Sequence, residues 1–228
     1  MKKKIKILQV IPKLGHGGAE TGCYDLAHFL PEKGYKSYIA TSGGELLKYI
    51  DKKKVKVFKL PVHSKNPILI LFNGIIISLL LLFYNINIVH VRSRAPAWSC
   101  FFAAKVTFRK LVSTFHGTYN FNSRIKKFYN SIMVRSDLVI AGSNFIFSHI
   151  NENYGDFFLK KKRKLLVIFR GINTEYFHPQ KVLPIKLDKF SKQYNIDRNK
   201  FIILLPGRLT AWKGQKVFIE ALKILHEK

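Results

Sequence analysis

The stretch IKILQVIPKLGHGGAE, residues 5–20, decides the fold of this chain. It opens with an apolar run of strand length at residues 5–11 and continues through a turn with three glycines in four positions. A helical pattern then runs over residues 19–33. A strand, a glycine-rich turn and a helix in this order are typical of the first unit of a parallel α/β sheet, where such turns lie at the edge that binds ligands.

The glycine turn favours an anionic ligand, because the following helix directs free N–H groups and the positive end of its dipole toward it. The spacing does not fit a dinucleotide cofactor, since Glu20 stands where that fingerprint needs a third glycine. We interpret Glu20 as a first-turn acid that complements the helix dipole. The alternative is a tight turn that only packs the helix on the strand.

The same alternation of strands and helices continues along the chain. Its apolar runs lack polar alternation, which predicts a parallel sheet covered by helices on both faces. We therefore expect a doubly wound, Rossmann-like α/β domain over residues 1–179. Its strands are expected at residues 5–11, 36–41, 55–60, 86–91, 111–115, 138–141 and 165–169. Its helices are expected at residues 19–33, 45–53, 96–108, 123–135 and 144–153.

The composition changes after residue 179. Residues 180–199 are mostly polar and basic and are interpreted as a linker with one short helical pattern. FIILLPG, residues 201–207, predicts a further buried strand, and a helix is expected from residue 215 onward. One strand and one helix cannot bury their own apolar faces, so residues 200–228 are expected to form only the first βα unit of a truncated second domain.

The charge balance is strongly positive, with 40 Lys and Arg against 13 Asp and Glu and a net charge of +27. Such a charge favours anionic partners such as a membrane surface or phosphorylated substrates, although a lysine-rich bias on solvated faces is equally compatible with it. The cations are spread along the chain without a nucleic-acid-binding signature, so no nucleic-acid partner is expected. Cys23 and Cys100 have no metal-ligand spacing, which predicts a reducing compartment and no structural metal.

The most apolar segment is PILILFNGIIISLLLLFY, residues 67–84, which Asn73 and Gly74 interrupt. It is shorter than the roughly 20 apolar residues that a spanning helix needs. Three interpretations stay open: a helix packed on the sheet, a helix that also enters a membrane surface, and a true span. The apolar run at the start of the chain is too short for a signal peptide, so the protein is expected in the cytoplasm.

Three further motifs place polar side chains in loops where ligands bind. TFHGTYN (residues 114–120) puts His116 after the fifth expected strand, and VRSRAPAWS (91–99) puts Arg92 and Arg94 after the fourth. PGRLTAWKGQ (206–215) places Arg208 and Lys213 before the last helix, a pattern that suits a diphosphate clamp. The alternatives are a histidine that only braces its loop and arginines that pair with nearby acids.

Together these motifs resemble those of family 4 retaining glycosyltransferases of the GT-B fold. The matches, in chain order, are GGAE, VRSRAPAWS, TFHGTYN, DLVIAGSNFI, RGINTEYFHP and LLPGRLTAWKG. The set is most similar to members that build lipopolysaccharide-type or other cell-envelope glycans. The resemblance implies two facing Rossmann-like domains, the amino-terminal one for the acceptor and the carboxyl-terminal one for a nucleotide-sugar.

The resemblance also implies a role for each matching residue, with the nucleotide-sugar as co-substrate and with no metal or other cofactor. By this resemblance, His116 contacts the transferred sugar. The residues that bind the donor are Gly17, Gly18, Arg208 and Lys213, and those that bind the acceptor are Arg94 and Tyr119.

Members of the family carry most of a second domain beyond this point, including a loop with two glutamates. We therefore expect a truncated glycosyltransferase that moves a hexosyl-type sugar from a nucleotide-sugar to a lipid-linked or envelope glycan acceptor. It is expected in the cytoplasm or peripheral on the cytoplasmic face of the inner membrane, where an anionic surface is a further partner. The alternative is an inactive remnant or an interaction module that keeps only the acceptor-domain fold.

Overall fold

The structure is a computed structural model that describes residues 4–119, 123–159 and 163–226. The chain divides into two compact units, Met1–Gly171 and Ile172–Lys228, each of which is described by itself. The domain boundary expected at residue 179 lies within the second unit.

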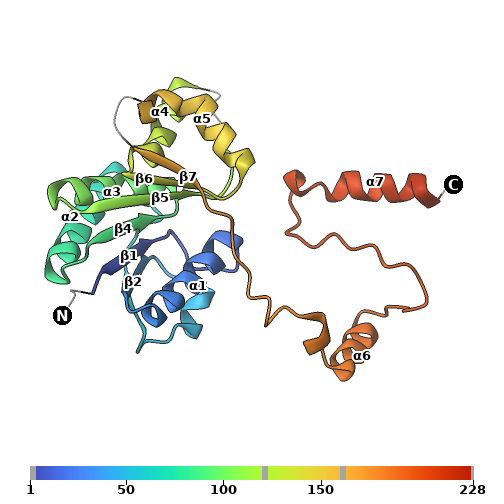
Figure 1. Cartoon of the computed structure of the whole chain (residues 1–228). Coiled ribbons are helices and arrows are strands. Elements are labelled where there is room, and N and C mark those ends of the chain that lie inside the picture. Colours follow the sequence, from blue (N-terminus) through green and yellow to red (C-terminus); the bar gives the residue numbers. More distant parts are fainter. Residues whose placement is uncertain (1–3, 120–122, 160–162, 227–228) are drawn as a thin grey trace. The chain divides into compact units, whose positions relative to one another are not determined.

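A seven-stranded parallel sheet forms the centre of the first unit, in the order β3-β2-β1-β4-β5-β6-β7 (Figure 1). β2 and β3 follow one another on one side of β1, and β4, β5, β6 and β7 follow one another on the other side. The topological switch point therefore lies between β1 and β4, and the predicted doubly wound fold is confirmed. The strands are β1 (Lys6–Val10), β2 (Lys36–Thr41), β3 (Val55–Lys59), β4 (Ile88–Val91), β5 (Lys110–Phe115), β6 (Leu138–Ala141) and β7 (Lys164–Val167).

Helices cover the sheet on two faces because buried strands have apolar side chains on both sides. Along β2, Ile39 packs with Cys23 and Ala27 of α1, whereas Tyr38 and Ala40 belong to the cluster on the opposite face. The first face carries α1 (Gly18–Glu32) and the short 3₁₀ helix η1 (Glu45–Tyr49). The opposite face carries α2 (Pro67–Phe83), α3 (Arg94–Val106), α4 (Arg124–Asn130), η2 (Ser131–Arg135) and α5 (Asn144–Leu159), as Figure 1 shows for α1 against α2 and α3.

Three expected helices differ from those observed. The helix expected at residues 45–53 is only the 3₁₀ helix η1, and the one expected at 123–135 divides into α4 and η2. α5 continues beyond the expected end at residue 153, through a kink where Tyr154 has non-helical backbone angles. The buried Tyr154 hydroxyl donates to the carbonyl of Lys127 at 2.9 Å, which ties the kink to α4.

α2 packs on the sheet and on α3 through a face that includes its few polar residues. Gly74 lies against the ring of Phe102, and the Asn73 side chain donates to the carbonyl of Pro61 at 3.1 Å. Ile77 and Leu81 of the same face are fully buried. In the part of the chain that the structure describes, no helix has the length and hydropathy needed to span a membrane.

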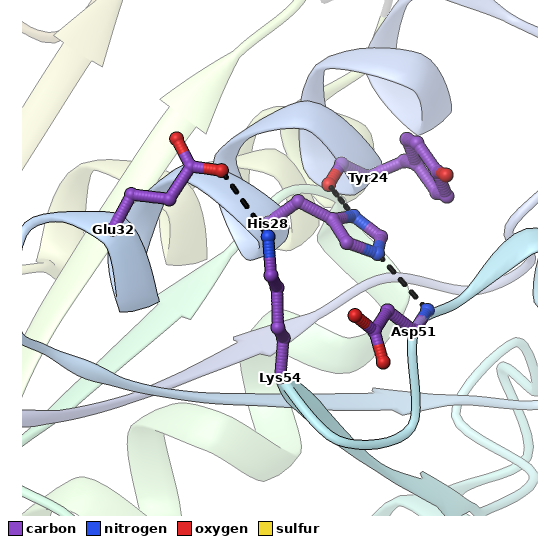
Figure 2. Close-up of polar contacts among 5 residues, drawn as sticks. All are labelled: Tyr24, His28, Glu32, Asp51 and Lys54. Carbon is purple, nitrogen blue, oxygen red and sulfur yellow. Dashed lines mark hydrogen bonds and ion pairs between the residues drawn. The ribbon is translucent and has the colours of Figure 1, made fainter.

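A polar link holds α1 against the turn that precedes β3 (Figure 2). His28 contacts the Tyr24 carbonyl through Nδ1 at 2.9 Å, and its Nε2 accepts the N–H of Asp51 at 3.1 Å. Nδ1 therefore carries the proton, because one nitrogen must donate and the other must accept. Glu32 and Lys54 form an exposed ion pair beside it at 3.4 Å.

The second unit contains helices, and no residue that the structure describes there lies in a strand. The strand predicted at residues 201–207 is wrong: this segment forms no strand pairing and its apolar side chains are exposed. The physical reason is that a strand needs a neighbouring strand to bond its backbone. The helical segments are η3 (Pro179–Lys181), α6 (Pro184–Gln193), η4 (Ala211–Lys213) and α7 (Gln215–His226).

Candidate active site at the carboxyl edge of the sheet

The glycine turn between β1 and α1 is fixed by the loop that follows β2. The N–H of Leu14 donates to the carbonyl of Gly43 at 2.7 Å, and the carbonyl of Leu14 accepts from Leu46 at 3.0 Å. Gly44 has a φ of 132°, and a side chain there would collide with the Leu14 backbone. Gly43 and Gly44 were not identified from the sequence as supports of this turn, although their pairing immediately after a strand is a signal for such a contact.

α1 begins at Gly18, with Gly17 as an N-cap that has no side chain to satisfy the free N–H groups. The carboxylate of Glu20 turns back over Gly17 and occupies the place that a Gly17 side chain would take. This position agrees with the interpretation of Glu20 as a first-turn acid facing the positive end of the helix. A side-chain carbon on Gly18, in contrast, would lie 2.6 Å from Nη1 of Arg170.

His116 follows β5 directly and is the centre of the site. The guanidinium of Arg170 contacts its Nδ1 through Nη2 at 2.7 Å. Since a guanidinium has only donors, Nδ1 accepts and the imidazole proton lies on Nε2. That Nε2 atom is buried and has no hydrogen-bond partner among the described residues. Burial first, and then the charges of Arg92 and Arg170, lower the pKa of His116 to about 3, so the ring is neutral.

Arg92 comes from the end of β4, next to β1 at the switch point. It is buried, and its Nε donates to Oε1 of Gln9 at 3.0 Å, while Nε2 of Gln9 donates to the carbonyl of Cys23 at 3.0 Å. Burial lowers the pKa of the Arg92 guanidinium, and the nearby positive charge of Arg170 lowers it further. Within the described ranges, neither Arg92 nor Arg170 forms an ion pair with a carboxylate. Two cations without an acid favour an anionic ligand.

Arg94 and Tyr119, both predicted on the acceptor side, contact each other. The guanidinium of Arg94 lies 4.3 Å from the centre of the Tyr119 ring, and its Nη1 donates to Oδ1 of Asn130 at 2.9 Å. The Tyr119 N–H donates to Nε2 of His149 at 3.3 Å. Burial raises the pKa of the Tyr119 hydroxyl to about 12, so it remains a neutral donor. The pair links the His116 loop, which contains Tyr119, to the start of α3, which contains Arg94.

Arg208 and Lys213 lie in the second unit, in the loop that enters α7. The Gln215 side chain donates to the carbonyl of Arg208 at 2.8 Å, and Gly214 ends the 3₁₀ turn with a φ of 75°. This contact closes the loop, and the donor-binding role of both side chains stays a prediction from the loop pattern and the resemblance.

The structure thus brings Gly17, Gly18 and His116 together at one edge of the first unit. Sequence reasoning missed Arg170 as a member of this group, although the residue lies in the motif RGINTEYFHP. The available signal was its place after the last strand of a parallel sheet, since all carboxyl ends of such strands meet at one edge.

The chain matches the model of Glycosyltransferase Family 4 over residues 16–176. It is 28% identical to an N,N'-diacetylbacillosaminyl-diphospho-undecaprenol alpha-1,3-N-acetylgalactosaminyltransferase of Campylobacter jejuni, in an alignment covering 77% of this chain and 48% of the relative. It is 27% identical to an uncharacterized glycosyltransferase of Methanocaldococcus jannaschii, covering 99% of this chain and 62% of that protein.

The chain is also similar to solved structures. A glycosyltransferase from Rickettsia africae is 43% identical with a TM-score of 0.82, covering 99% of this chain and 58% of that one. Anabaena HepE, solved with UDP and glucose, is 21% identical with a TM-score of 0.74 and shows likeness of fold, covering 96% of this chain and 57% of that one. The chain therefore spans about half to three-fifths of the length of these four proteins.

Proposed function

The chain belongs to Glycosyltransferase Family 4, and from this we propose that it serves the transfer of a sugar from a nucleotide-sugar to a lipid-linked or envelope glycan acceptor. The observation that carries the proposal is the group at the carboxyl edge of the sheet: a neutral His116 held by Arg170 beside the Gly17–Gly18 turn. It provides N–H donors and positive charge, which suit the oxygens of a sugar diphosphate.

In the proposed reaction, the bond between the anomeric carbon and the diphosphate oxygen breaks. The anomeric carbon bonds to an acceptor hydroxyl oxygen, and the hydroxyl proton passes to the departing diphosphate. Negative charge grows on the diphosphate as the bond breaks, so cations near it lower the barrier. We assign this role to Arg208 and Lys213, sugar contact to His116, phosphate contact to the Gly17 and Gly18 backbone, and the acceptor side to Arg94 and Tyr119.

The proposal is tested first by binding. UDP and UDP-glucose, the ligands of the Anabaena protein, are titrated into the purified chain by calorimetry. Arg208→Ala and Lys213→Ala are expected to weaken binding on the order of tenfold each, because each removes a charged hydrogen bond. Arg198→Ala and Lys189→Ala remove exposed cations of the same unit and serve as matched controls. Equal affinity in all four variants would contradict the assignment, and absence of nucleotide-sugar binding would contradict the donor proposal.

We also propose that α2 brings the protein to an anionic membrane surface. The polar residues of this helix lie on its buried face, where Asn73 and Ser78 accompany Gly74, Ile77 and Leu81, whereas its exposed face is apolar. The exposed apolar residues are Ile68, Leu71, Phe72, Ile75, Leu79, Leu82 and Phe83. A net charge of +27 supports attraction to anionic lipids, and the Campylobacter relative is named for a diphospho-undecaprenol-linked substrate.

Vesicle binding tests this part of the proposal. The chain is expected to sediment with vesicles containing phosphatidylglycerol and to be released as salt is added, because salt screens the attraction. Replacing both Leu79 and Phe83 by Ser is expected to reduce binding strongly. The control replaces Ile125 and Phe145, which are similarly exposed on other helices, by Ser. Equal loss of vesicle binding in the two double variants would contradict a role for α2. Equal binding to neutral vesicles at high salt would contradict a role for the positive charge.

A further inference from the structure

Arg170 joins three segments that are far apart in the sequence. It follows β7, its Nη2 lies 2.7 Å from Nδ1 of His116 after β5, and its Nη1 covers Gly18 at the start of α1. A side-chain carbon on Gly18 would come within 2.6 Å of Nη1, so the end of the Arg170 side chain would have to move from its present position if residue 18 carried a side chain. The contact therefore depends on the glycine turn as well as on the histidine.

The contact determines the protonation state of the ring. A guanidinium has only N–H donors and cannot accept a hydrogen bond. Nδ1 must therefore keep its lone pair as the acceptor, and the single N–H of the ring must be at Nε2. A doubly protonated imidazolium would place an N–H against the guanidinium N–H and two positive charges beside each other. The pair is stable only with a neutral ring.

We propose that Arg170 is a positioning residue that holds His116 as a neutral imidazole with Nε2–H as its free donor, and that Gly18 is required because a side chain there displaces the guanidinium. The part of this inference that concerns catalysis rests on the proposed function, in which Nε2–H donates to an oxygen of the bound sugar nucleotide. The part that concerns the ring itself does not.

The surroundings of His116 support a neutral ring. Arg92 and His90 approach from β4 and the residues that follow it, and Arg170 approaches from the segment after β7. On the α1 side the nearby titratable group is Glu20, whose carboxylate lies over Gly17. Burial together with the two arginines lowers the pKa of His116. Removing one of these charges is therefore expected to raise it.

The test follows the ring nitrogens of His116 by ¹⁵N NMR between pH 4 and pH 8, with His116→Gln used to assign the signal. In Arg170→Met, the ¹⁵N chemical shift of Nδ1 is expected to move to the value of an imidazole nitrogen that accepts no hydrogen bond. The titration midpoint of the His116 ring is expected to rise. Arg170→Lys keeps the charge and one donor, so its ring, like that of the wild type, should stay neutral down to pH 4. Arg109→Met removes an arginine that bonds Asn85 instead and is the matched control. Unchanged signals in Arg170→Met overturn the proposal.

Two glycine variants test the role of Gly18. Gly18→Ala is expected to reproduce the NMR shifts of Arg170→Met. In the variant that combines both substitutions, the His116 ring signals should shift no further. Gly17→Ala displaces the Glu20 carboxylate instead of Arg170 and should leave the His116 signals in place. Identical spectra for Gly18→Ala and the wild type would show that the glycine does not admit the guanidinium.

Nucleotide-sugar titration separates this inference from the proposed function. If the chain binds UDP-glucose, Arg170→Met is expected to weaken binding on the order of tenfold, with Arg170→Lys in between. If the chain does not bind it, the proposed function fails while the NMR result still decides the state of the ring. Binding that Arg170→Met leaves intact, despite shifted ring signals, would overturn the catalytic part of the inference.

Discussion

At the scale of single residues, His90 and His116 share Arg92 as a positively charged neighbour. Burial, followed by the charge of Arg92, lowers the pKa of both rings, and His90 lies well below its ordinary value. Nε2 of His90 is 2.7 Å from the hydroxyl of Thr114 inside the sheet. Both rings therefore function as neutral hydrogen-bonding groups, one in the core and one at its edge.

This environment predicts how stability depends on pH. Both histidines bind protons more weakly in the folded state than in the unfolded state, whose pKa is about 6.5. The unfolded chain thus binds more protons below that value, and the free energy of unfolding should fall as the pH drops from about 6.5 toward 3. Urea unfolding at several pH values measures the slope. The variant with His90→Gln and His116→Gln should show a shallower slope, and an equally steep one would contradict the prediction.

At the scale of elements, α2 shows how an apolar segment serves two surfaces. Its buried face packs on the sheet and α3, and the small residue Gly74 allows the Phe102 ring to approach the helix backbone closely. Its exposed face carries side chains such as Ile75 and Phe83 that contribute no core packing. Folding and surface binding should therefore respond to different positions of the same helix.

A pair of isoleucines on α2 separates the two roles. Ile77 is fully buried and Ile75 is 47% exposed, so Ile77→Ala leaves a cavity and Ile75→Ala does not. We expect Ile77→Ala to lower the free energy of unfolding by about 2–5 kcal/mol and Ile75→Ala by less than about 1 kcal/mol. Vesicle binding should show the opposite order among folded variants. Similar unfolding free energies for the two variants would contradict the packing of α2.

The elements also show what the sequence can predict. Strands of a parallel sheet are apolar on both sides, so β2 and β6 were predicted at the bounds observed. The strand at residues 201–207 was predicted by the same signal and is wrong, because the pattern reports apolar side chains and not a partner strand. Helix ends were missed where local backbone decides them, as at the kink of Tyr154.

The candidate site was partly predictable for a similar reason. The sequence places His116 and Gly18 after strands, and the topology of a parallel sheet then brings these strand ends to one edge. Arg170 was missed because its side chain returns to a histidine 54 positions earlier, a contact that no local pattern encodes. The roles of Arg208 and Lys213 came from their loop pattern and from the resemblance, and they remain predictions.

At the scale of the whole molecule, the two units differ in how much they bury. Every buried residue among those the structure describes lies in the first unit, from Leu8 to Tyr154. The second unit exposes the apolar side chains of residues 201–205 and one apolar side of α7. Cooperative unfolding should therefore be a property of the first unit.

Expression of residues 1–171 tests this expectation. The shortened chain contains all seven strands and every buried residue described, so its urea midpoint should match that of the full chain, and its slow-exchanging amides in β1, β4 and β5 should be retained. A chain of residues 1–141 lacks β7 and α5, including the buried Ile150 and Tyr154, and is expected to be less stable by several kcal/mol at least, since two large core side chains are lost. If the chain of residues 1–171 unfolded at a clearly lower urea concentration than the full chain, residues 172–228 would contribute to the core of the first unit.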